Sequence, residues 1–436
     1  MDRPNIIIVI ASDMGQHLGC YGYADVRSPN VDGFAQTGVR FANSFCTAPQ
    51  CSPSRATLWT GRFAHANGVV GLAHGGFAND LNPGERHLSR ILRDAGYETH
   101  LFGSQHETLA PGDVGHEHMV QGGTCDEVAS NFAEFLEQRG VGERPLFVEM
   151  GFFEAHRPFP HNGVDAQPHD QMIVPPHLPD IPIIREDLSE MGASISTMDR
   201  AVGRILEAVR TSSIADNTIV VFTVDHGAPF PRAKMTLYDP GIEVPLIIAG
   251  PGVPAGVVRG EMISNVDLLP TLLELAGLPL PSNLHGQSFR GLLTGGDYMP
   301  NEAVFAEKTY HTYYDPMRAI RTDRWKLIAN FEHAPSQETS PDYADNAKGY
   351  VETARAMNVP CDALYHPPFE LFDLESDPHE QHNLADDPAH RDTRDELIRA
   401  LHDWMARTED PLLEGPLPQG AYKRRMAAFR EIAHTD

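Results

Sequence analysis

The sequence predicts an α/β protein with a mostly parallel central sheet, followed by a smaller C-terminal α+β region. Three observations support this fold class. The 436 residues exceed the length at which a single hydrophobic core usually stops growing. Over roughly the first two thirds of the chain, apolar runs of strand length alternate with helical patterns. Beyond that, short strand-like runs follow one another without intervening helices. We therefore expect two domains, residues 1–300 and 301–436.

The first domain is predicted from two sets of segments. Runs of strand length are Ile6–Ala11, Thr99–Phe102, Leu146–Met150, Thr218–Thr223 and Pro245–Ala249. Helical patterns are Val31–Thr37, Leu88–Ala95, Val128–Arg139 and Leu188–Arg210. The last of these repeats apolar residues every three or four positions, which predicts a helix with one buried face. Such alternation is typical of a parallel sheet covered on both faces, with ligands bound beyond the carboxyl ends of its strands.

The second domain is predicted to hold a small antiparallel sheet and a closing helix. Its strand-like runs are Ala303–Ala306, Met317–Arg321, Lys326–Ala329 and Glu370–Leu374. The helix spans Arg391–Arg407 and carries apolar residues at helical spacing. Within the first domain, the Pro-rich stretch 158–182 has no period and is interpreted as a surface loop.

Composition excludes several classes of protein. With 34 basic and 60 acidic residues, the net charge of −26 argues against a nucleic-acid ligand. No apolar run of 18 residues is present, which argues against a membrane span. Five scattered cysteines do not suggest a disulfide framework. The first strand-like run begins almost at Met1, without a signal-peptide pattern, so we expect a cytoplasmic protein. The oligomeric state stays open, a homo-oligomer included.

The segment Cys51-Ser-Pro-Ser-Arg55 is the sharpest local signal. Pro53 and Ser54 stand where a helix would begin, so backbone N–H groups and the helix dipole would point toward an anion near Cys51. Arg55 adds a positive charge. Taken alone, a cysteine two residues before a proline is more typical of an ordinary thiol at the start of a helix.

Two aspartates are candidate metal ligands. Asp13 and Asp225 each lie just past the end of a predicted strand, so both carboxylates can meet at one edge of a parallel sheet. A hard divalent cation prefers such oxygen ligands. For either residue alone, a turn or helix cap would be the simpler interpretation. Together with Cys51, they favour a metal site.

The motif Cys51–Arg55, closed by Thr60-Gly61, resembles the signature of the sulfatase family. In that family the motif directs oxidation of the cysteine to formylglycine by a maturation enzyme. The resemblance continues along the chain in Asn5–Asp13, Gly103–His106, Glu154–Pro158 and Phe222–Gly227. It implies an alkaline-phosphatase-like fold, one divalent cation, and hydrolysis of a sulfate ester or sulfamate.

A further likeness concerns the substrate. Pro229-Phe230-Pro231, after the second metal strand, is similar to the sulfamidase branch of the family, which implies a sulfated sugar such as N-sulfoglucosamine. The resemblance also implies roles for individual residues. The predicted catalytic residues are Cys51, Arg55, His106, His156 and Lys234. The predicted substrate contacts are Glu154 and His311, with Glu307, Lys308 and Tyr314 in the same C-terminal loop. The predicted metal ligands are Asp13, Asp225, His226 and the modified Cys51.

In this scheme, the hydrated aldehyde at position 51 attacks sulfur. His106 and His156 protonate the leaving group, because the neutral-range pKa of histidine suits proton transfer. Arg55 and Lys234 offset the charge on the nonbridging oxygens.

Departures from the family pattern leave the metal open. The family usually carries an acid at the position of Ser12 and an asparagine at that of His226. Imidazole is a poor ligand for Ca²⁺ and a good one for Mn²⁺. The resemblance to the family still places Ca²⁺ first. The imidazole of His226 makes Mn²⁺ a serious rival, and Mg²⁺ is a third candidate. Ser104 and Lys234 replace a family lysine and a sulfamidase arginine, so a bidentate grip is lost at position 234.

Two alternative functions remain. The pair Asp225-His226 also occurs in phosphonate monoester hydrolases, which makes a phosphonate monoester or phosphodiester hydrolase the nearest rival. Because Ser12 and Ser104 replace groups that usually support catalysis, a catalytically silent binder of sulfated glycans is the second alternative. The intact motif at Cys51–Arg55 favours an enzyme over a binder.

Overall fold

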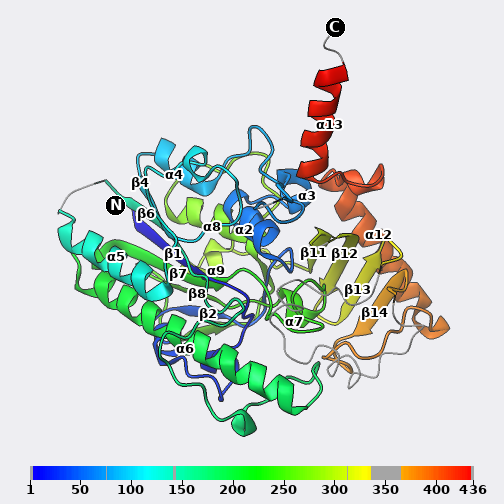
Figure 1. Ribbon diagram of the computed structural model, residues 1–436, viewed down its shortest axis with the longest axis horizontal. Coiled ribbons are helices and arrows are strands. Elements are labelled where there is room, and N and C mark those ends of the chain that lie inside the picture. The colour runs from blue at the N-terminus through cyan, green and yellow to red at the C-terminus, as the bar shows by residue number, and fades with distance from the viewer. Residues whose placement is uncertain (1–2, 75, 141–143, 312, 335–364, 434–436) are drawn as a thin grey trace.

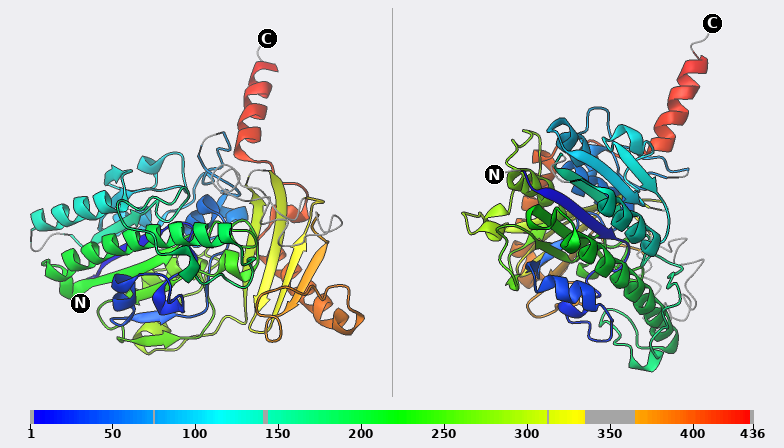
Figure 2. Two further views of the ribbon diagram at one scale, coloured as in Figure 1. Left: turned by 60° about the horizontal axis from the view of Figure 1, so that its bottom comes forward. Right: turned by 90° about the vertical axis from the view of Figure 1, so that its left-hand side faces the viewer.

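A computed structural model describes residues 3–74, 76–140, 144–311, 313–334 and 365–433. Its ribbon shows a large central sheet between two layers of helices, with a second, smaller sheet beside it (Figure 1 and Figure 2). This arrangement confirms the predicted fold class. None of the described helices is both long and apolar enough to cross a membrane.

The main sheet has eight strands in the order β5-β4-β6-β1-β7-β8-β2-β9. β1 lies inside it and pairs in parallel with β6 and β7, whereas β8 runs antiparallel to β7 and β2. The strands are β1 (Asn5–Ala11), β2 (Val39–Phe41), β4 (Glu98–Gly103), β5 (His118–Gln121), β6 (Leu146–Gly151), β7 (Thr218–Val224), β8 (Leu246–Ala249) and β9 (Val257–Arg259). Every residue of β1 is buried, as its unbroken apolar run predicts.

Helices cover both faces of this sheet. They are α1 (Pro29–Ala35), α2 (Cys51–Thr60), α3 (Ala64–Asn67), α4 (Leu88–Asp94), α5 (Cys125–Gln138), α6 (Pro182–Thr211), α7 (Asp239–Ile242), α8 (Leu268–Leu275) and α9 (Arg290–Thr294). Alternate residues of β1 divide between the two faces. Ile7 and Val9 belong to the apolar cluster of α1, α5 and α6, while Ile8 and Ile10 belong to that of α2, α4, α8 and α9.

Helices α5 and α6 begin several residues before the start that the sequence pattern predicts, for local reasons. α5 starts at Cys125 because Thr124 and Glu127 form a capping box with reciprocal hydrogen bonds. α6 starts at Pro182, and proline suits the first helical position because its missing N–H would be unpaired there. The Pro-rich stretch before α6 is irregular, apart from a short 3₁₀ turn at His169–Gln171.

The smaller sheet is antiparallel, in the order β11-β12-β13-β14. Its strands are β11 (Ala303–Tyr310), β12 (Tyr314–Thr322), β13 (Trp325–Asn330) and β14 (Phe369–Asp373). Helix α12 (Arg391–Arg407) has the predicted bounds and buries Leu401 and Trp404 with Leu327 and Leu371 of the sheet. All these elements follow residue 300, although the exact domain boundary stays a prediction.

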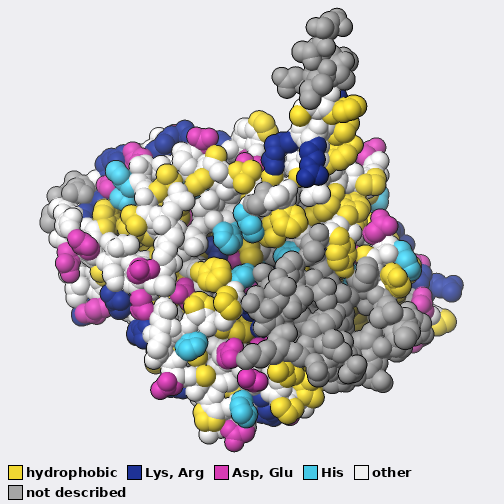
Figure 3. Space-filling model, viewed as in Figure 1, with side chains coloured by type: hydrophobic (Ala, Val, Ile, Leu, Met, Phe, Trp, Pro, Cys, Tyr) yellow, Lys and Arg dark blue, Asp and Glu magenta, His cyan; other side chains and the backbone are white. Residues whose placement is uncertain are grey.

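Three further elements lie outside these two sheets and the helices named above. The short strands β3 (Ser44–Phe45) and β10 (Ile263–Ser264) pair in parallel with each other. Helix α13 (Gly420–Ala433) projects away from the body of the molecule, and Figure 3 shows hydrophobic and basic side chains at its base. Tyr422 and Phe429 of this helix are exposed.

Candidate active site

The carboxyl ends of β1 and β7 bring two acidic residues together. The strands are in register, with Ala11 opposite Val224, so Asp13 and Asp225 follow at the same edge. The backbone N–H of Asp13 donates to Oδ1 of Asp225 at 3.0 Å. Both aspartates are fully buried. The predicted convergence of these two side chains is therefore present.

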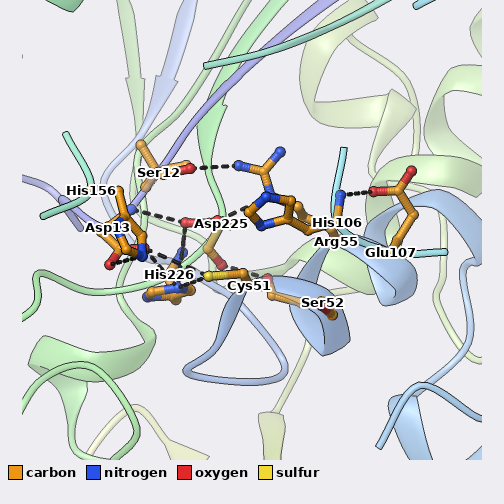
Figure 4. A network of polar contacts seen from close by, with 12 residues as sticks. Ser12, Asp13, Cys51, Ser52, Arg55, His106, Glu107, His156, Asp225 and His226 are labelled. Carbon is orange, nitrogen blue, oxygen red and sulfur yellow. Dashed lines mark hydrogen bonds and ion pairs between the residues drawn. The ribbon is translucent and has the colours of Figure 1, made fainter. Parts of the chain in front are cut away.

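Cys51 and His226 complete this group. Together with Asp13 and Asp225, they offer ligand atoms that all lie within 4.8 Å of one another. Nε2 of His226 lies 3.1 Å from Oδ1 of Asp13 and 3.3 Å from Sγ of Cys51. Cys51 is the first residue of α2, so its side chain lies at the positive end of the helix dipole (Figure 4). The four residues predicted as metal ligands thus form one cluster.

The hydrogen bonds of His226 suit a metal ligand. Its Nδ1 lies 2.9 Å from the carbonyl oxygen of Gly227, which can only accept, so Nδ1 carries a proton. The lone pair of Nε2 can then face Asp13 and Cys51, the orientation usual for metal-bound histidine. Burial lowers the pKa of His226, but Asp225 and Asp13 raise it well above its ordinary value. The two carboxylates thus attract positive charge, and the donor set fits a divalent cation.

The side chain of Arg55 is held in place beside the cluster of candidate metal ligands. Its side chain is buried, its Nε donates to Oδ2 of Asp225 at 3.0 Å, and its Nη2 donates to Oγ of Ser12 at 2.8 Å. Its Nη1 has no hydrogen-bond partner in the described part of the chain. Ser12, which replaces a family acid, also donates to the carbonyl of Phe152. Ser12 therefore fixes the position of the Arg55 guanidinium.

Ser54 and Asn265 support the site, and the sequence analysis did not identify either role. Oγ of Ser54 donates to the carbonyl oxygen of Asp225 at 2.5 Å. The side-chain amide of Asn265 donates to Ser54, and its oxygen accepts from the backbone of Thr47. The motif contains Ser54, but no pattern around Asn265 signals its contact with the motif. These bonds fix the start of α2 against the end of β7.

Lys234 and His156 lie on the other side of Asp13. Nζ of Lys234 is 2.5 Å from Oδ2 of Asp13 and 3.5 Å from Nε2 of His156. Burial would raise the pKa of Asp13, but Lys234, His156 and His226 hold it well below its ordinary value. His156 Nδ1 faces the carbonyl of Arg157 at 2.6 Å, so its Nε2 is the atom turned toward the site. Its side chain is 14% exposed, whereas that of Asp13 is fully buried.

His106 lies in the same network but with different electrostatics. It follows β4, and Figure 4 shows its ring beside Arg55. Burial and the charge of Arg55 lower the pKa of His106 to about 3. The neutral-range pKa predicted for this residue is therefore wrong. His106 is uncharged near pH 7 and can contact a bound anion only as a neutral group.

The predicted substrate contacts require correction. Glu154 is 1% exposed, and both its carboxylate oxygens accept from the backbone N–H of Cys125 at the start of α5. This carboxylate stabilises a helix N-terminus and is not presented to a sugar. Glu307 and Lys308 lie in β11, not in a loop, and are buried against His65 and Asp315.

The remaining two residues of that group differ in position. Tyr314 begins β12, so it too lies outside the turn. His311 does lie between β11 and β12, where it is buried, with its backbone N–H 3.3 Å from the carbonyl of Tyr313. Its contact with substrate stays a prediction.

Comparison with known families gives two matches. Residues 4–278 match the family model described as Sulfatase. Residues 231–347 match the model described as N-sulphoglucosamine sulphohydrolase, C-terminal.

Full-length relatives agree with these matches. Human N-sulphoglucosamine sulphohydrolase is 28% identical, with 100% of this chain and 96% of the relative covered. An ulvan-active sulfatase of Formosa agariphila is also 28% identical, with 95% of this chain and 82% of the relative covered.

Solved structures share the fold. A protein in complex with its substrate D-glucosamine-2-N,6-O-disulfate superposes with a TM-score of 0.71 at 20% identity, covering 94% of this chain and 99% of the other. The phosphonate monoester hydrolase of Agrobacterium radiobacter superposes with a TM-score of 0.73 at 21% identity, covering 96% and 100%.

Proposed function

Because this chain belongs to the sulfatase family, we propose that it hydrolyses a sulfate ester or sulfamate of a sulfated sugar, with N-sulfoglucosamine as the leading substrate. One observation carries the proposal: Cys51, Asp13, Asp225 and His226 meet within 4.8 Å at one edge of the sheet. The substrate class is supported by the match over residues 231–347 and by the human relative.

Members of this family use a divalent metal and a formylglycine made from the motif cysteine. The residues that would hold the metal here are Asp13, Asp225, His226 and the modified residue 51. A bound cation would supply positive charge to polarise a sulfate oxygen. Because Nε2 of His226 faces Asp13 and Cys51, we place Mn²⁺ before Ca²⁺, the reverse of the order expected from the sequence. The maturation enzyme that makes formylglycine is the partner this proposal requires.

The side chains have separate tasks in this proposal. Arg55, whose Nη1 has no hydrogen-bond partner among the described residues, binds the nonbridging oxygens of the sulfate together with Lys234. His156 delivers the proton to the leaving oxygen or nitrogen through Nε2, because Nδ1 is already bound to a carbonyl. His106 donates a hydrogen bond as a neutral imidazole. Asp225 keeps Arg55 in place through a 3.0 Å ion pair.

A phosphonate monoester or phosphodiester hydrolase is the second candidate. His226 favours it, and the phosphonate monoester hydrolase of similar fold is consistent with it. A phosphodiester or phosphonate presents one charge and a tetrahedral centre, as a sulfate ester does, so the same cationic side chains could bind it. The sugar-related match over residues 231–347 favours the sulfatase.

The test combines mass and rate. The protein is produced together with a competent maturation enzyme, and the mass of the peptide containing Cys51 is measured by mass spectrometry. A loss of about 18 Da, or its hydrated form, is expected for conversion of the thiol to an aldehyde. Rates are then compared on N-sulfoglucosamine, a sugar sulfate ester and a phosphonate monoester.

The controls separate the alternatives. Cys51→Ala should abolish turnover, whereas Cys20→Ala, outside the site, should not. An unmodified thiol together with binding of sulfated glycans would show a binder instead of an enzyme. Faster hydrolysis of the phosphonate than of either sulfated sugar would replace the sulfatase by the second candidate.

A further inference from the structure

A second cluster of histidines and carboxylates lies behind Arg55, on the α2 and α4 side of the main sheet. His87 is the N-cap of α4, Glu107 follows β4, His116 precedes β5, and Glu149 is in β6. All four are buried, with exposed fractions of 4% or less. Figure 4 shows Glu107 at the end of the network opposite Asp13.

Ligand atoms of His87, His116 and Glu149 lie within 4.8 Å of one another, and Glu107 lies beside His87. Nε2 of His116 lies 3.0 Å from Oε2 of Glu149, and Nε2 of His87 lies 3.9 Å from the same oxygen. Oε1 of Glu107 is also 3.9 Å from Nε2 of His87. Ligand atoms of a tetrahedral zinc site, with bonds of about 2.0 Å, stand about 3.3 Å apart. The three measured distances bracket that value.

The orientation of the His87 ring follows from its neighbours. Its Nδ1 accepts from the backbone N–H of Ser89 at 3.1 Å, as the side-chain cap of α4. The same Nδ1 lies 2.7 Å from Oγ of Ser89. Nε2 is therefore the ring atom turned toward the carboxylates of Glu107 and Glu149.

Several of these ligand atoms lack a hydrogen bond among the described residues. Nε2 of His87, Oε1 of Glu107 and Oε1 of Glu149 are buried without a hydrogen bond in the part of the chain that the structure describes. Leaving buried polar atoms unpaired is costly, and more so for charged groups. The nearby cation, Arg55, is already bound to Asp225. When both carboxylates are ionised, one divalent cation would neutralise their charge.

We propose that His87, His116, Glu149 and Glu107 bind a structural Zn²⁺ ion, separate from the cation of the active site. Two imidazole nitrogens and two carboxylate oxygens form a donor set that suits zinc. Four protein ligands leave no open position for water or substrate, as in structural zinc sites. The site is thus not expected to perform chemistry of its own.

The ion would position His106. The backbone N–H of His106 donates to Oε2 of Glu107 at 3.0 Å, so a metal bond at Glu107 fixes the segment that carries His106. Glu107 thereby links the buried cluster to the active site. His106 would be held by β4 on one side and by the metal-bound Glu107 on the other.

The experiment counts metals in the full-length protein by mass spectrometry after exhaustive dialysis. Asp13→Asn/Asp225→Asn removes two ligands of the active-site cation and should retain one zinc per chain. Adding Glu149→Gln, which keeps the side-chain shape, should remove that zinc. His161→Gln changes an exposed histidine outside the cluster and should retain it.

A spectroscopic readout makes the result independent of activity. Cobalt loaded into the Asp13→Asn/Asp225→Asn protein should give the intense visible bands of tetrahedral coordination, and Glu149→Gln should abolish them. If the double aspartate variant does not fold, wild type and the single Glu149→Gln variant are compared, and a loss of one zinc is expected. Equal zinc contents in folded wild type and Glu149→Gln would overturn the proposal and leave a cluster held by protons alone. Neither result depends on whether the protein proves to be a sulfatase.

Discussion

The backbone N–H of Asp13 donates a 3.0 Å hydrogen bond to the carboxylate of Asp225, although 212 positions separate the two residues in sequence. The bond ties the ends of β1 and β7 together and directs both carboxylates toward Cys51 and His226. Burial would raise the pKa of Asp225, but His226, Arg55 and this hydrogen bond lower it. Both acids are therefore ionised and ready to bind a cation at neutral pH.

Replacing His226 should change the choice of metal. In the variant His226→Asn, an amide oxygen replaces Nε2, and oxygen ligands suit Ca²⁺ better than imidazole does. We expect the ratio of the rate with Mn²⁺ to that with Ca²⁺ to fall about 10-fold or more, measured on stripped protein reloaded with each ion. His17→Asn, outside the ligand set, is the control. A ratio that is the same in the variant and the wild type would contradict the assignment of His226 as a ligand.

His106→Ala should lower activity without changing its pH dependence. Because the pKa of His106 is lowered to about 3, first by burial and then by Arg55, this ring stays neutral above pH 5. Loss of one donor to the bound sulfate should reduce kcat/KM roughly 100-fold. The acidic limb of the kcat/KM profile should keep its midpoint. A displaced midpoint would show that His106 does titrate in the working range. His74→Ala, at the neighbouring ring, is the matched control.

Acid should destabilise the fold in part through His17. Burial lowers the pKa of His17 to about 4, against a hydrogen bond to the carbonyl of Met14 that raises it. The unfolded chain therefore binds more protons below about pH 6.5. This contribution to stability is complete above that pH and is lost as the pH falls toward 4.

The variant His17→Asn tests that contribution, since its amide can still donate to Met14. The decrease in the free energy of unfolding between pH 7 and pH 5, measured in urea, should shrink by about 2 kcal/mol. His161→Asn, at an exposed position, should leave the decrease unchanged. An equal decrease in wild type and His17→Asn would assign the acid sensitivity to other groups.

The buried ion pair of Arg318 should be essential for stability. Oδ2 of Asp410 accepts from Nε of Arg318 at 2.6 Å, and both side chains are fully buried. Asp410→Asn would leave a buried guanidinium with only Glu307 at 3.5 Å as an acidic partner. We expect a loss of about 3 kcal/mol in the free energy of unfolding. Glu207→Gln breaks an exposed pair with Arg210 and should have no measurable effect.

The sequence predicted those parts of the fold that a strong local pattern determines. β1 and β7 are unbroken apolar runs, and α12 repeats apolar residues at helical spacing, so each was identified. β2, β5 and β9 were not, because they have only three or four residues and depend on pairing with distant strands for their conformation.

The candidate site shows the same division. The cluster of Cys51, Asp13, Asp225 and His226 followed from the motif and the strand ends. Glu154 was interpreted from its place in a motif, but its hydrogen bonds to Cys125 depend on how α5 packs, which one sequence does not reveal. The second histidine and carboxylate cluster comes from four separate segments without fixed spacing, so no local pattern could identify it.

All ten residues of α2 are buried, and Cys51 itself is only 4% exposed. An enzyme that oxidises this thiol would have to reach it before α2 is packed. We therefore expect the proposed oxidation of Cys51 to take place during biosynthesis. The yield of active protein should then depend on the supply of the oxidising enzyme while the chain is being made, and treatment after folding should leave the thiol intact.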